Sequence, residues 1–76
     1  MDKVIWYSGT RGKERPLKII YKNIEYFVDD IVSHKIIEEL DTQYRWEEYV
    51  CRCGDKFFFL KEEITGWRIE EYERKE

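Results

Sequence analysis

Apolar side chains recur at every second position through most of this chain, and this alternation limits its fold more than any other feature. A period of two is typical of β-strands with one buried face, because successive side chains of a strand point to opposite faces. The alternation predicts all-β structure, with strands over residues 3–8, 17–21, 24–28, 45–53, 56–63 and 66–73.

Short turn signals separate these runs. Lys22-Asn23 and Gly54-Asp55 are typical two-residue hairpin turns, and Thr65-Gly66 supplies another reversal. Connections this short join antiparallel neighbours, because a parallel crossover needs a dozen or more residues. We therefore predict one domain over residues 1–76, a small antiparallel meander of five to six strands that forms a curled sheet or a partly open barrel.

The stretch "DDIVSHKIIEELDTQ" (29–43) fits two secondary structures. As a helix, it would begin at an aspartate cap and bury a stripe that includes Val32 and Ile36. As a strand, it would put Val32, His34 and Ile36 on one face, and its β-branched pairs favour this interpretation. We predict a bent strand with a bulge or bend at the two aspartates, and a short helical turn near residues 38–43 stays open.

The composition sets the size of the core and the expected environment. Aromatic residues make up 17% of 76 residues, which is enough to form a core without disulfides. Charged residues make up 41%, and labile amides are scarce, a pattern associated with thermophilic proteins. No apolar run has the length of about 18 residues that a membrane span needs, and no signal peptide pattern follows Met1. We expect a cytoplasmic protein with reduced thiols and no membrane contact.

Two cysteines in "CRCGDKFFFL" (51–60) offer the clearest chemistry. On a strand, Cys51 and Cys53 face the same side about 6.5–7 Å apart, at the limit of disulfide reach. A structural zinc site needs four ligands, and His34 is the one histidine in the chain, so a site would need His34 plus a carboxylate, or two cysteines from each of two chains. The favoured interpretation is two packed thiols, with a metal-dependent or thiol-dependent site at Cys51, Cys53 and His34 as the alternative. A turn at Gly54-Asp55 would place Cys51 opposite Phe58; a three-residue turn would place it opposite Phe59.

Charge is distributed unevenly along the chain. Residues 1–22 carry six basic and two acidic side chains, whereas residues 23–76 carry eight basic and fifteen acidic ones. The loop 9–16, "GTRGKERP", is basic, and turns that contain glycine expose backbone N–H groups that bind anions. A solvated loop is the simpler interpretation. As candidate contacts for an anion or a partner we take Arg11, Lys13, Arg15, Lys18, Tyr7 and Trp67.

The order of these segments resembles that of a group of small uncharacterised prokaryotic antiparallel β-domains. The residues that carry the likeness are "YSGTRGKERPLKIIYKNIEYFVDDIV", then "YVCRCGDKFFFL" and "GWRI". The resemblance implies a compact antiparallel domain of unassigned function, and it carries over no functional residue. The cysteines in the late hairpin depart from that group.

No arrangement of residues indicates catalysis. The glutamate pairs lie at adjacent positions, and adjacent residues of a strand face opposite sides, so each pair gives a solvated carboxylate and not a dyad. We expect no cofactor. The sequence favours a non-enzymatic binding module that uses the loop 9–16 with nearby aromatic residues, or an exposed strand edge. A protein partner or self-association is plausible. A nucleic acid is a weaker candidate, because the acidic remainder of the chain opposes strong nucleic-acid binding.

Overall fold

The computed structural model describes residues 2–8 and 14–72, and within them every regular element is a β-strand. The prediction of an all-β antiparallel protein is confirmed. The count of five to six strands was wrong, because residues 30–38 form a strand of their own. The seven strands are β1 Lys3–Ser8, β2 Glu14–Tyr21, β3 Ile24–Phe27, β4 Asp30–Glu38, β5 Arg45–Cys53, β6 Lys56–Glu63 and β7 Gly66–Tyr72.

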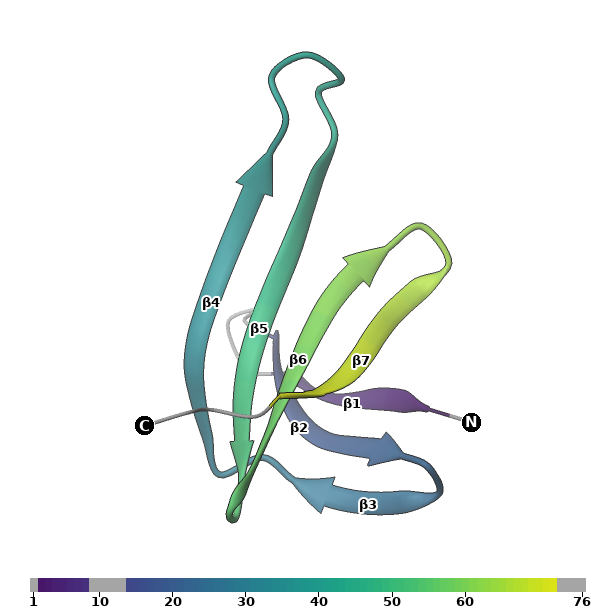
Figure 1. Cartoon of the computed structure of the whole chain (residues 1–76), viewed down its shortest axis with the longest axis vertical. Coiled ribbons are helices and arrows are strands. Elements are labelled where there is room, and N and C mark those ends of the chain that lie inside the picture. The colour runs from purple at the N-terminus through teal and green to yellow at the C-terminus, as the bar shows by residue number, and fades with distance from the viewer. Residues whose placement is uncertain (1, 9–13, 73–76) are drawn as a thin grey trace.

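These strands form two sheets, and the predicted curled sheet or partly open barrel is wrong. β1, β2 and β3 make a three-stranded sheet, and β4 to β7 make a four-stranded sheet, each in sequence order (Figure 1). The division lies between β3 and β4. The Val28 N–H donates to the Leu17 carbonyl in the first sheet, whereas the Asp29 N–H donates to the Arg52 carbonyl in the second. Adjacent residues thus bond to different sheets, so the hydrogen-bond ladder is interrupted there.

Residues 30–38 form the predicted strand, and the helical turn near 38–43 is wrong. Glu38 still pairs with Arg45, and the Glu39 N–H donates to the Tyr44 carbonyl across the hairpin. These contacts continue the β4–β5 hairpin as far as Glu39 and Tyr44, and residues 40–42 at its tip form a turn and no helix. The register shifts between Ile31 and Ser33, so β4 contains a bulge at Val32, two residues beyond the predicted position at Asp29-Asp30.

The hairpin turns are the best-predicted parts of the fold. Lys22 and Asn23 both have positive φ angles, of 51° and 66°, as a two-residue hairpin turn requires. Gly54 has φ 65°, and the pairs Cys53–Lys56 and Cys51–Phe58 confirm the register expected for a two-residue turn. The third reversal lies one residue earlier than predicted, because Gly66 already pairs with Glu63.

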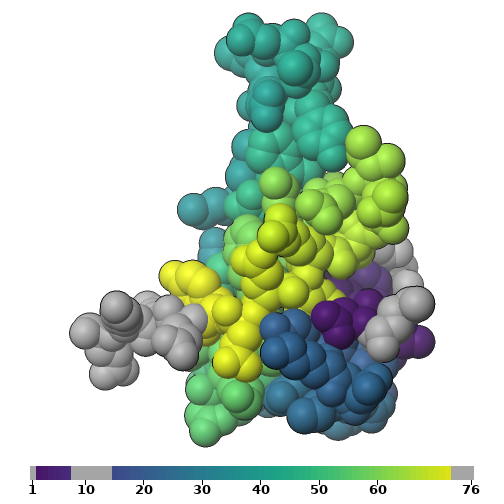
Figure 2. Space-filling model, turned by 45° about the vertical axis from the view of Figure 1, so that its right-hand side comes forward, coloured from purple at the N-terminus to yellow at the C-terminus, as the bar shows by residue number. Residues whose placement is uncertain are grey.

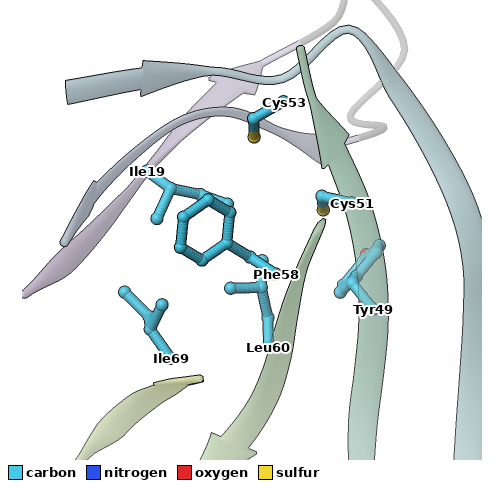
Figure 3. Close-up of a cluster of buried hydrophobic side chains, with 7 residues drawn as sticks. All are labelled: Ile19, Tyr49, Cys51, Cys53, Phe58, Leu60 and Ile69. Atoms are coloured by element: carbon cyan, nitrogen blue, oxygen red, sulfur yellow. The ribbon is translucent and has the colours of Figure 1, made fainter. Parts of the chain in front are cut away.

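The core lies between the two sheets (Figure 3). Its centre is Phe58 of β6, which is fully buried and contacts the rings of Tyr21 and Tyr26 at centroid distances of 5.4 and 4.8 Å. The buried residues come mainly from the four-stranded sheet: Ile19, Tyr49, Cys51, Cys53, Phe58, Leu60 and Ile69. Among the described residues, no helix is long and apolar enough to cross a membrane.

Candidate interaction surface

Cys51 and Cys53 are buried free thiols in the wall of the core. Burial raises the pKa of the Cys51 thiol from 9.0 to about 12, and the neighbouring Cys53 adds to this shift. Burial also raises the pKa of Cys53 from 9.0 to about 11, with a smaller contribution from the carboxylate of Asp29. Both thiols therefore stay protonated at neutral pH, whereas nucleophiles and metal ligands need the thiolate.

His34 belongs to a different set of contacts from the cysteines. Its ring stacks on Tyr49, with centroids 4.1 Å apart, and its Nε2 lies 3.8 Å from a carboxylate oxygen of Glu47. Ile31 lies opposite Cys51, so the histidine is not the cross-strand neighbour of either thiol. In the part of the chain that the structure describes, no three histidine, cysteine or acidic residues come together in a way that could hold a metal ion.

Aromatic and basic side chains come together on the outer face of the three-stranded sheet. The Arg15 guanidinium lies 5.4 Å from the centre of the Tyr7 ring, and the Lys18 ammonium lies 5.3 Å from the centre of the Phe27 ring. Both separations fall within the range of cation–π attraction. We call this set the basic face: Tyr7, Arg15, Lys18 and Phe27.

A bulge in β2 is what puts these residues on one face. Ile5 pairs with Lys18, but Trp6 pairs with Pro16, so Leu17 is an extra residue in the ladder. Arg15 and Lys18 are three positions apart and would face opposite sides of a regular strand. The extra residue restores a common face, and it brings Arg15 opposite Tyr7.

The other predicted contact residues lie elsewhere. Trp67 is half-buried and packs in the core against Trp6 and Tyr49, with ring centroids 4.8 and 5.8 Å apart. Arg11 and Lys13 lie outside the described residues. The predicted loop 9–16 is shorter than expected, because residues 14–16 belong to β2. Phe27 was not among the predicted contact residues, although alternation in "IEYF" requires Tyr26 and Phe27 to face opposite sides.

Two edge strands of the four-stranded sheet differ in how they could meet another chain. β4 carries a bulge and an exposed lysine, Lys35, and both features discourage pairing with a further strand. β7 pairs regularly with β6 from Gly66 to Tyr72, with no shift of register. Among the described edges, β7 is therefore better suited to strand addition than β4.

Comparison with known proteins assigns no family to this chain. No protein-family model, no curated protein and no solved structure matches it. The resemblance to small prokaryotic β-domains therefore stays a prediction.

Proposed function

We propose that this protein is a non-enzymatic binding module whose basic face binds an acidic segment of another protein. The observation that carries the proposal is the exposure of two aromatic rings that each have a cation beside them. Phe27 is 64% exposed and Tyr7 is 47% exposed, although aromatic rings are the main source of core in so small a chain. Exposed rings flanked by cations provide both apolar contact and attraction for carboxylates.

The charge distribution supports an anionic partner. The first 22 residues have a net charge of +4, within a chain whose net charge is −3. The acidic remainder of the chain would repel a negatively charged partner, so such a partner is directed to the first 22 residues.

Charge also favours an acidic protein segment over a nucleic acid. Nucleic-acid affinity depends on the number of phosphates that free cations neutralise. On the basic face, Lys18 already forms an ion pair with Glu25, at 2.9 Å. A peptide needs fewer cations, because its apolar side chains can use Phe27 and Tyr7. The thiol or metal alternative has no comparable support, since both thiol pKa values are raised.

A titration followed by amide chemical shifts tests the proposal. We expect a short peptide of alternating glutamate and leucine to shift the amides of Tyr7, Lys18 and Phe27 at low salt, with a smaller effect at high salt. Lys18→Glu should abolish the shifts. Lys35→Glu, which makes the same charge change on β4, should leave them in place.

Two outcomes would overturn this assignment. One is the absence of any shift on the basic face at low salt. The other is a response to a single-stranded oligonucleotide but not to the acidic peptide, which would make nucleic acid the partner.

A further inference from the structure

In the described part of the chain, the outer edge of β7 has no hydrogen-bonded strand beside it, although β1 packs near its start, where Trp6 contacts Trp67. β7 ends the four-stranded sheet, and no other strand in the described ranges pairs with it on the side away from β6. Figure 2 shows β7, in yellow, running across the surface of the molecule. The backbone N–H and C=O groups along such an edge are a template for strand addition.

The sequence of β7, "GWRIEEY", is complementary to itself in antiparallel orientation. We propose that the protein forms a twofold dimer in which β7 pairs with β7 of a second copy, with Ile69 opposite Ile69. This register gives opposite charges at one pair and a tyrosine ring over a glycine at another, and Glu71, opposite Trp67, keeps its ion pair with Lys56. The pairs are Arg68 with Glu70, Trp67 with Glu71, and Gly66 with Tyr72.

Neighbouring registers are unfavourable. Moving one strand by two residues along the other places Arg68 opposite Arg68, or Glu70 opposite Glu70. Like charges directly opposite each other destabilise a sheet. A shift of one residue puts the core face of one sheet beside the outer face of the other, because side chains alternate. The register centred on Ile69 keeps both core faces on the same side of an eight-stranded sheet.

The dimer would extend a charge pair that already exists within one copy. Arg68 Nε lies 2.8 Å from a carboxylate oxygen of Glu70 on the outer face. Pairing adds the same two groups from the second copy, which produces a network of two arginines and two glutamates. Because these side chains are exposed, we expect the dimer to be weak and to weaken further at high salt.

Charge reversal with a mixing step tests the dimer. We measure mass by sedimentation equilibrium from micromolar to millimolar concentration. Arg68→Glu and Glu70→Arg should each weaken the dimer about tenfold or more, because each places like charges opposite at two symmetric pairs. Lys35→Glu on β4 makes the same change of net charge as Arg68→Glu, so it is the matched control for that variant and should leave the dimer unchanged.

Mixing the two single variants separates the intermolecular pairs from the pair within each copy. One variant then carries acidic groups at positions 68 and 70 and the other carries basic groups at both, so all pairs between copies are attractive. We expect the mixture to dimerise at least as well as the original protein. A monomeric original protein at millimolar concentration, a dimer insensitive to both variants, or a mixture that stays monomeric would each overturn the proposal.

Discussion

The two faces of β6 provide a direct test of the fold, because Phe57 and Phe58 are adjacent and point to opposite sides. Phe58 is fully buried between the sheets, whereas Phe57 is half-buried on the outer face. Replacing a buried phenylalanine with alanine costs about 3–5 kcal/mol in the free energy of unfolding, from lost transfer energy and the cavity left behind. Replacing Phe57 should cost about 1–2 kcal/mol, because part of its ring stays in water.

The expected loss at Phe58 is a large share of the total stability. A protein of 76 residues is typically stable by about 4–11 kcal/mol, at roughly 0.05–0.15 kcal/mol per residue. Urea unfolding followed by tryptophan fluorescence measures both variants, since Trp6 and Trp67 lie in contact inside the core. The measurement is made at low protein concentration, so that association does not contribute.

One result for these two variants would refute the assignment of Phe58 to the buried face of β6. A Phe57→Ala variant that loses as much stability as Phe58→Ala, or more, would mean that the outer face of β6 is the buried one. If Phe58→Ala does not fold, Phe58→Leu and Phe57→Leu give the same comparison with smaller losses, because leucine retains part of the volume.

Three further predictions concern the thiols, the contact between Asp29 and Gly54, and the β5–β6 turn. Folding raises both thiol pKa values, so the protonated thiols contribute stability that is fully present below about pH 9 and is lost as pH rises through about 11 and 12. The stability advantage of the original protein over a Cys51→Ala variant should therefore shrink between about pH 7 and pH 10 in urea unfolding. The Gly54 N–H donates to the Asp29 carboxylate, so Asp29→Asn should cost about 1 kcal/mol in the free energy of unfolding. The same variant should lower the pKa of Cys53 in a thiol titration, and an unchanged pKa would contradict the contribution assigned to the Asp29 carboxylate. Gly54→Ala should cost about 1–2 kcal/mol by thermal unfolding, and the loss comes from φ 65° alone, because no heavy atom lies within 4 Å of the added Cβ.

Local chemistry made the hairpins predictable from the sequence. The strands 45–53 and 56–63 have the bounds that alternation indicated, because Gly54-Asp55 fixes a two-residue turn and the turn fixes the register. The prediction that both thiols are packed in the core rests on the same register, which places Cys51 opposite Phe58.

The division into two sheets was not predictable from alternation. Which strands join depends on where the backbone hydrogen bonds of residues 28 and 29 go, and these bonds reach partners 11 and 23 positions away in the sequence. Period-two patterns report which side chains share a face, but they do not report where one ladder ends and another begins.

Bulges limited the prediction of the candidate site in the same way. Arg15 and Lys18 share the basic face only because Leu17 is an extra residue in β2. In β4 the shift between Ile31 and Ser33 puts His34 on the side of Tyr49. A bulge inserts one residue without a strong sequence signal, and it reverses the facing of every residue beyond it.

Apolar residues fall on both faces of the β5–β6 hairpin, although the core lies on only one of them. The β4–β5 hairpin reaches well beyond the three-stranded sheet (Figure 1), and its tip residue Leu40 is 90% exposed. On the outer face, the charged Lys61 covers the ring of Trp46, with its ammonium 5.2 Å from the ring centre. Long charged side chains shield apolar surface in this way while their charged groups stay in water. The larger sheet can therefore keep an uncovered face without a second layer, and its free edges are where further contacts can form.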